Sequence, residues 1–420
     1  SHIVSVATAA KLFFCLYIII LPLSVWYFLH RVRPENCAYA LFASALTFNQ
    51  FVLMGNENFL SSIPVFFFFL GYWYRKRNNL DFHSWFVSSI LLLLLYYCHM
   101  LSFTCALLVM ITILLLEKRG VRDILRNTSI ALPSLFLFFA WIIRIAMHGA
   151  TQEAELTLLH RFPSWGEKIR QLVAGLVPFN ASFKESKFLG YIFLLSILFM
   201  IGFSIWKTFR KQRDRIWFWT IAILFIFAIS LPQILIILYP GQRVAYLAFL
   251  TASAFFSDKK IPRFCFLGFL IIFTFVVQIQ VIRYLATTSK LISHIVAPFK
   301  EAPYEISNRH KIVLPLVLYP YTRTAFCHRA FEYYNLFNGG VNPHHCISWN
   351  FTVRYRMRFP APHIYQPFPE KITNKMLETY DIIIVIGKDG YRGKELLDYL
   401  SSTGFTPVSE NDMTVVLSKI

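Results

Sequence analysis

A small number of polar side chains in this apolar chain carry groups that could bind a substrate or take part in catalysis. They fall in three short turns and are Asn56, Glu57, Asn58, His99, Gln242 and Arg243. A carboxylate can accept a proton or hold a metal ion, and an arginine can hold a phosphate through two hydrogen bonds. We therefore expect Glu57 and His99 to be catalytic and the Asn, Gln and Arg side chains to bind substrate.

The composition indicates that membrane helices position these residues. Of the 420 residues, 56% are hydrophobic and 15% are charged, whereas soluble domains usually carry about 25% charged residues. The net charge of +19 would suggest nucleic acid as the partner of a soluble protein. Here the Lys and Arg residues lie between long apolar runs, which instead indicates membrane topology and anionic headgroups. Membrane lipid, and not nucleic acid, is the expected partner.

The apolar runs predict about ten membrane-spanning helices, because a bilayer core needs roughly 20 helical residues to cross it. The long run 84–116 is divided at Tyr97-Cys98-His99, where polar groups interrupt the leucines. The spans predicted within a few residues are 7–29, 37–54, 58–73, 84–98, 101–116, 128–148, 188–206, 217–239, 244–256 and 264–282.

The basic residues give these spans a direction, since Lys and Arg gather in cytoplasmic loops. When alternate connections are assigned to opposite sides, the short turns 55–57, 99–100 and 240–243 hold Arg243 as their one basic residue. That side is therefore expected to be the exterior of an inner or plasma membrane, with both chain ends there. The loops of the other side hold Arg31, Arg33, Arg75, Lys76, Arg77, Lys118, Arg119, Arg122, Arg126, Lys207, Arg210, Lys211, Arg213, Arg215, Lys259, Lys260 and Arg263.

Single side chains in the outer turns also have simpler interpretations. Glu57 fits a solvated turn residue, and His99 fits a hydrogen-bonded residue that breaks a helix. Arg144, a further candidate for substrate binding near the outer end of a span, fits a side chain that extends to the headgroups. Arg243 fits nonspecific binding of lipid phosphate. The functional interpretation requires several of these residues to lie together.

Two larger segments fall on the outer side. Residues 149–187 contain a helix-period apolar pattern, which predicts an amphipathic helix on the membrane surface. The transmembrane domain is expected to cover residues 1–283, and an amphipathic connector, 284–309, leads to a soluble domain at 310–420. The fold class predicted is an all-α polytopic membrane protein with a small C-terminal α/β extracytoplasmic domain.

The strands and helix of that C-terminal domain are predicted from local patterns. Apolar runs indicate strands at 312–318, 380–387 and 413–417, and residues 392–403 have helical periodicity before Gly404. Strands that alternate with a helix are typical of a small α/β domain.

Cys327 and Cys346 both lie in the predicted outer domain, where a disulfide bond is chemically permitted. The alternatives are two free thiols or a metal site with the neighbouring histidines His328, His344 and His345. The spacing matches no common zinc pattern. A divalent metal ion is an open choice of cofactor.

The arrangement resembles the membrane glycosyltransferases of the GT-C fold, such as protein O-mannosyltransferases and bacterial lipid A aminoarabinose transferases. The resemblance lies in short helices paired by tight outer turns at Leu53–Phe59 and Leu94–Leu101, in Gln242-Arg243-Val244-Ala245-Tyr246 at the head of a late helix, and in the outer domain after the last span. It covers most of the chain and is one of organisation.

The resemblance implies a sugar donor carried on a polyprenyl phosphate and an acceptor, not identified, on the outer face. Arg243 would hold the lipid-linked phosphate, Glu57 would be a second carboxylate near the acceptor, and His99 would line the cavity. In that fold a first outer loop usually carries the main catalytic carboxylate. This sequence shows no such loop before its first span. Either a helix and this loop precede residue 1, or the chain is not a glycosyltransferase.

The sequence is compatible with three functions. The leading hypothesis is transfer of a sugar from a lipid-phosphate carrier to an outer acceptor. A transporter or flippase of a lipid-linked substrate would usually show internal repeats and polar groups at the membrane midplane, whereas here the polar groups gather at the outer face. A non-catalytic scaffold would leave Glu57, His99 and Arg243 apart.

Overall fold

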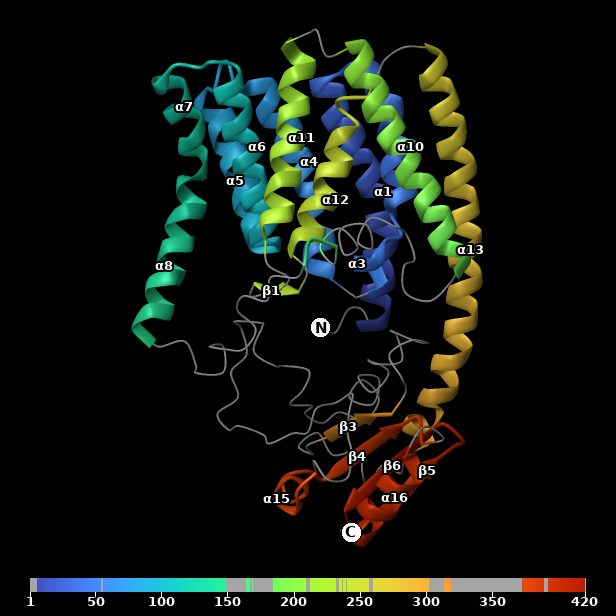
Figure 1. Cartoon of the computed structure of the whole chain (residues 1–420). Coiled ribbons are helices and arrows are strands. Elements are labelled where there is room, and N and C mark those ends of the chain that lie inside the picture. Colours follow the sequence, from blue (N-terminus) through green and yellow to red (C-terminus); the bar gives the residue numbers. More distant parts are fainter. Residues whose placement is uncertain are drawn as a thin grey trace. The chain divides into compact units, whose positions relative to one another are not determined.

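The computed structural model contains two compact units, Ser1–Ile279 and Gln280–Ile420 (Figure 1). Most of the described chain is helical, with one small mixed sheet in the second unit. The residues that the structure describes are 6–53, 56–148, 164–166, 168, 184–208, 212–231, 234–235, 237–238, 240–256, 260–301, 313–318, 372–388 and 392–419.

Helices α1 (Val6–Val32) and α4 (Glu57–Lys76) pack closely against each other. A Cβ atom placed on Gly71 of α4 would lie 3.0 Å from the Cα atom of Phe28 in α1. Glycine therefore permits the close approach of the two backbones at this point. The rings of Phe28 and Phe67 lie 5.4 Å apart between the same two helices.

Helices α5 (Phe82–Cys98) and α6 (Met100–Leu116) are joined by His99 alone. His99 has an extended backbone, with φ −164° and ψ 111°, and it ends one helix and begins the next. The division of the run 84–116 into two helices is thus confirmed. Helix α7 (Val121–Thr128), the turn η2 (Ser129–Ala131) and α8 (Leu132–His148) follow.

The predicted span 37–54 is not one helix. It consists of η1 (Pro34–Ala40), α2 (Leu41–Leu46) and α3 (Gln50–Leu53). The Asn49 side chain interrupts the helix, because its Oδ1 accepts hydrogen bonds from the Phe51 and Val52 amides while its Nδ2 donates to the carbonyl of Leu46. Such local bonds compete with the helical pattern.

Helices α10 (Lys184–Thr208), α11 (Gln212–Ser230), α12 (Pro240–Ala252) and α13 (Lys260–Glu301) complete the helical part. The predicted span 217–239 stops early, at Ser230. Two-residue strands β1 (Ile234–Leu235) and β2 (Ile237–Leu238) pair antiparallel before α12. Helix α13 joins a predicted span and residues 284–301 of the predicted connector in one helix, and the division between the two units falls within it.

Helix α12 is buried along its whole length from Gln242 to Ala252. The segment η1–α2–α3 runs antiparallel beside it, since the Tyr246 hydroxyl donates to the carbonyl of Leu46 at 2.8 Å near one end. At the other end Asn36 Nδ2 donates to the carbonyls of Ser253 and Phe256, at 3.0 and 2.9 Å. The carbonyls that follow this helix thereby gain partners they could not find within it.

Arg33 and Asp214 form a fully buried ion pair that ties α11 to the same place. Arg33 Nη1 lies 2.7 Å from Asp214 Oδ1 and 3.2 Å from the carbonyl of Ala254. Arg33 was predicted to be a loop charge that sets topology, whereas the structure buries it completely. A buried arginine needs such a paired anion, because an isolated charge in the interior is very costly.

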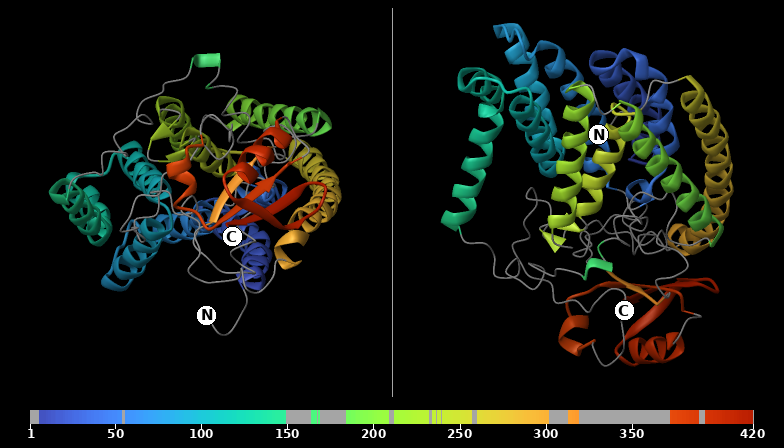
Figure 2. Two further views of the ribbon diagram at one scale, coloured as in Figure 1. Left: turned by 90° about the horizontal axis from the view of Figure 1, so that it is seen from below. Right: turned by 45° about the horizontal axis from the view of Figure 1, so that its top comes forward.

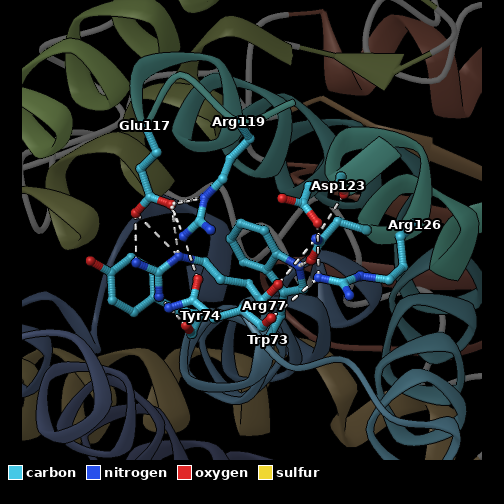
Figure 3. A network of polar contacts seen from close by, with 9 residues as sticks. Trp73, Tyr74, Arg77, Glu117, Arg119, Asp123 and Arg126 are labelled. Atoms are coloured by element: carbon cyan, nitrogen blue, oxygen red, sulfur yellow. Dashed lines mark hydrogen bonds and ion pairs between the residues drawn. The ribbon is translucent and has the colours of Figure 1, made fainter. Parts of the chain in front are cut away.

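A second polar network joins the ends of α4, α6 and α7 (Figure 3). Glu117 accepts hydrogen bonds from Arg77, at 2.6 Å for the shortest, and from Arg119 at 3.0 Å. Asn127 accepts from the Trp73 indole at 2.9 Å. Burial raises the pKa of the Glu117 carboxyl, but the hydrogen bonds and charges of Arg77 and Arg119 outweigh this effect and hold it below its ordinary value.

Large apolar side chains remain exposed in helical stripes. Leu12, Leu16, Ile19, Leu23 and Trp26 follow one face of α1. Leu132, Phe136, Phe139 and Ile143 follow one face of α8.

By length and composition, two helical segments of the described chain could cross a membrane: Lys11–Val32 and Arg263–Gln280. Shorter apolar helices are Phe82–Cys98, Met100–Leu116 and Tyr191–Trp206.

The second unit contains a four-stranded sheet in the order β3-β4-β6-β5, with β3 and β4 parallel and the other pairs antiparallel. Its strands are β3 (Val313–Val317), β4 (Ile382–Ile386), β5 (Phe405–Glu410) and β6 (Thr414–Lys419).

Both faces of this sheet are covered, which explains why β4 is buried throughout. The end of α13, with Ile295 and Phe299, packs on one face. Helix α16 (Gly393–Ser402) lies along the other (Figure 2). The short helix α15 (Asn374–Leu377) adds Leu377 to the same side. Strand β5 and the short helix α15 were not predicted from the sequence.

Asn36→Ala should lower the free energy of unfolding by about 1–3 kcal/mol, because the Ser253 and Phe256 carbonyls would lose a buried donor. Thermal unfolding of the purified protein in detergent micelles measures the effect. Asn79→Ala changes an exposed asparagine in a turn and is the matched control. Equal unfolding temperatures for the two variants would contradict this account of how α12 is held.

Candidate functional site

Arg243, in the first turn of α12, brings together residues from three separate turns. Its Nη1 lies 2.8 Å from Nε2 of His99, and its Nη2 donates to Oδ1 of Asn56 at 3.1 Å. Asn56, His99 and Arg243 were all selected from the sequence as site residues. The structure places them in direct contact, and we refer to them as the Arg243 cluster.

The Arg243 cluster lies where three helices begin. Asn56 is the N-cap of α4, His99 is the N-cap of α6, and Arg243 lies in the first turn of α12. Neither the Asn56 nor the His99 side chain caps its own helix. Helix N-termini carry partial positive charge and free N–H groups, so their convergence around a guanidinium favours an anion strongly.

Several buried polar atoms of this cluster and of the adjacent Gln242 have no hydrogen-bond partner within the described part of the chain. They are Nε of Arg243, Nδ2 of Asn56 and Oε1 of Gln242. Arg243 is 7% exposed and Gln242 is 4% exposed. Two of these atoms are donors, and a buried donor without a partner carries a free-energy cost that a bound acceptor would remove.

Aromatic rings enclose the guanidinium of Arg243. Its Cζ lies 5.4 Å from the ring centre of Phe59 and 5.8 Å from that of Phe51. The His99 ring meets Phe59 edge to face at 5.1 Å. These rings limit the movement of the guanidinium and exclude water from one side, which strengthens its electrostatic interactions.

His99 also contacts a pair of serines that the sequence analysis did not select. Its Nδ1 lies 3.4 Å from Oγ of Ser102, and that Oγ lies 2.7 Å from Oγ of Ser62. Both serines are fully buried. Buried serines in an apolar run carry no distinctive pattern, although Ser102 follows His99 at the i+3 position expected for one face of a helix.

Burial, with a smaller contribution from the charge of Arg243, lowers the pKa of His99 to about 3. The imidazole is thus neutral at physiological pH. A neutral imidazole has one donor and one acceptor nitrogen, and its pairing with Arg243 requires Nε2 to be the acceptor.

The other predicted site residues are placed less closely. Glu57 and Asn58 begin α4 beside Asn56, and both are exposed. Among the described residues, no hydrogen bond or ion pair joins the Glu57 carboxylate to the Arg243 cluster. Arg144 lies in α8, and its side chain is outside the described part of the structure. Cys327 and Cys346 also lie outside the described residues, as does most of 149–187.

Metal binding was a further question raised by the sequence. Within the residues that the structure describes, no three His, Cys, Asp or Glu side chains gather closely enough to hold a metal ion. The cysteines described are Cys15, Cys37, Cys98, Cys105 and Cys265, and all are free thiols.

Comparisons with protein-family models, with curated proteins and with solved structures give no match to this chain. The site is therefore interpreted from its own geometry.

The lowered pKa of His99 predicts a specific dependence of stability on pH. In the unfolded chain His99 binds a proton near pH 6.5, whereas in the folded protein it does so near pH 3. The contribution of neutral His99 to the free energy of unfolding is therefore fully present above pH 6.5 and is lost as the pH falls toward 3. His99→Gln should remove this contribution. Unfolding temperatures measured between pH 7 and pH 4 should fall less steeply in the variant, and parallel curves would contradict the lowered pKa.

Proposed function

We propose that the chain is a multi-pass membrane protein with the Arg243 cluster at the outer face. The exposed apolar stripes on α1 and α8 support lipid contact, because soluble proteins rarely expose contiguous apolar surfaces of this size. In Figure 1 the ends of α4, α6 and α11 that carry the loop arginines lie together, away from the start of α12. The positive-inside rule then assigns the arginine-rich end to the cytoplasm.

We further propose that the Arg243 cluster binds the phosphate of a lipid-linked substrate. The observation that carries this proposal is the buried guanidinium with unpartnered donors at the point where three helices begin. Each feature alone is common, but together they offer charge, N–H groups and a partly dehydrated setting to one anion. A phosphate attached to a lipid would reach this cluster from the bilayer without leaving it.

The reaction best supported is transfer of a sugar from a polyprenyl-phosphate carrier to an outer acceptor, as in GT-C glycosyltransferases. An acceptor hydroxyl would attack the anomeric carbon of the sugar, and the bond from that carbon to the phosphate oxygen would break. Arg243 would stabilise the negative charge on the departing phosphate. A carboxylate would take the hydroxyl proton, and Glu57, next to Asn56 and exposed, is the candidate in this chain.

Arg243→Ala should reduce sugar transfer by about 10²–10³-fold, because it removes the charge that stabilises the leaving phosphate. The measurement is transfer from radiolabelled polyprenyl-phosphate sugars to a panel of acceptors in reconstituted vesicles. Arg243→Lys keeps the positive charge but lacks the planar guanidinium with its paired N–H donors. This variant should retain part of the activity.

Arg122→Ala is the matched control, since Arg122 is exposed in α7 and is proposed to face the cytoplasm. It should leave transfer unchanged. Flux of the labelled lipid across the membrane without transfer would instead indicate a transporter or flippase. Absence of both activities with every donor tested would contradict the proposed function.

A further inference from the structure

The contacts of His99 determine the direction of each hydrogen bond around it. Arg243 can only donate, so Nε2 of His99 is an acceptor and the hydrogen of the neutral ring is on Nδ1. At the far end, Ser62 donates its hydroxyl hydrogen to the carbonyl of Phe59 at 2.6 Å. Ser62 must therefore accept from Ser102, and Ser102 must accept from Nδ1 of His99.

The result is one continuous series of donors that starts at Arg243 and ends at a backbone carbonyl of α4. The two serines are fully buried, so bulk water does not compete for their hydrogen bonds. The series passes through α12, the turn between α5 and α6, then α6 and α4. It fixes the tautomer of the imidazole as well as its orientation.

We propose that His99 is a positioning residue and not a general base: the Ser62–Ser102 pair keeps its Nδ1 protonated, and its Nε2 then holds Arg243 in the phosphate-binding orientation. This inference rests on the proposed phosphate site. Asn56 provides the second fixed point, because Nη1 is held by His99 and Nη2 by Asn56. With these two groups held, the Nε–H edge of the guanidinium keeps one direction.

Burial and the charge of Arg243 keep the ring of His99 neutral at physiological pH. Among the described charged groups, Arg243 is the one that acts on the imidazole, and it disfavours a second positive charge. Helix α4 presents the neutral ring of Phe59, and α6 presents the neutral hydroxyl of Ser102. The Nε2 lone pair is occupied by Arg243, so it is not free to take a proton from a substrate.

The tautomer can be tested directly, whatever the substrate proves to be. Nitrogen NMR spectra of the full chain, labelled at histidine and reconstituted in lipid nanodiscs, should show His99 protonated at Nδ1 alone at pH 7. Ser102→Ala removes the acceptor of the Nδ1–H group and should shift the Nδ1 resonance, while Arg243 still requires Nε2 to be the acceptor. An imidazole protonated at Nε2, or at both nitrogens, would overturn the inference.

Binding of farnesyl phosphate to the same nanodiscs tests the positioning role. His99→Ala should weaken binding roughly tenfold to hundredfold, the amount expected when a hydrogen bond to a charged group is lost. His99→Gln should bind nearly as wild type, because an amide oxygen can replace Nε2 as the acceptor. His83→Ala, which changes an exposed histidine of α5, is the control and should have no effect.

The two proposals fail in different ways. If wild-type protein does not bind farnesyl phosphate while His99 is protonated at Nδ1, the phosphate site is wrong and the hydrogen-bond series is right. If wild type binds and His99→Ala binds equally well, His99 does not position Arg243. If His99→Gln binds normally but loses all sugar transfer, His99 acts as a base and the inference is overturned.

Discussion

Burial of α12 is the constraint on which the first unit depends. A helix buried along its full length cannot turn either end to water, so the polar groups at both ends need protein partners. At the C-terminal end Asn36 and Arg33 donate to the carbonyls of Ser253, Ala254 and Phe256. At the N-terminal end Arg243 meets Asn56 and His99. The same requirement therefore explains a structural anchor and a candidate site.

The two ends differ in whether the arginine is paired with a carboxylate. Arg33 is balanced by Asp214, and this pair lies against the negative end of the helix dipole, where a cation is favoured. Arg243 lies at the positive end, where its charge is disfavoured, and among the described residues no carboxylate pairs with it. An electrostatic cost of this kind is usually retained where it serves binding, since an incoming anion would remove it.

Much of the first unit could be predicted from the sequence because long apolar runs and tight polar turns are local signals. The paired helices around His99 were predicted correctly, and Asn56, His99 and Arg243 were selected because polar residues are scarce there. The interruption at Asn49 was missed, because it depends on side-chain bonds to the backbone. The burial of Arg33 was missed because a salt bridge to Asp214, far along the chain, has no local pattern. Ser62 and Ser102 were missed for the same reason: their role appears only when α4 and α6 lie side by side.

The connection between α5 and α6 is a single residue, and its length determines which face of α6 is turned toward α4 and α12. One residue added after Cys98 would turn α6 by about 100° about its axis, since an α-helix has 3.6 residues per turn. Ser102 would then leave Ser62, and the imidazole would no longer face α12. The spacing between Cys98 and Met100 therefore has to be kept, and comparisons among related chains should align this turn by length before residue type.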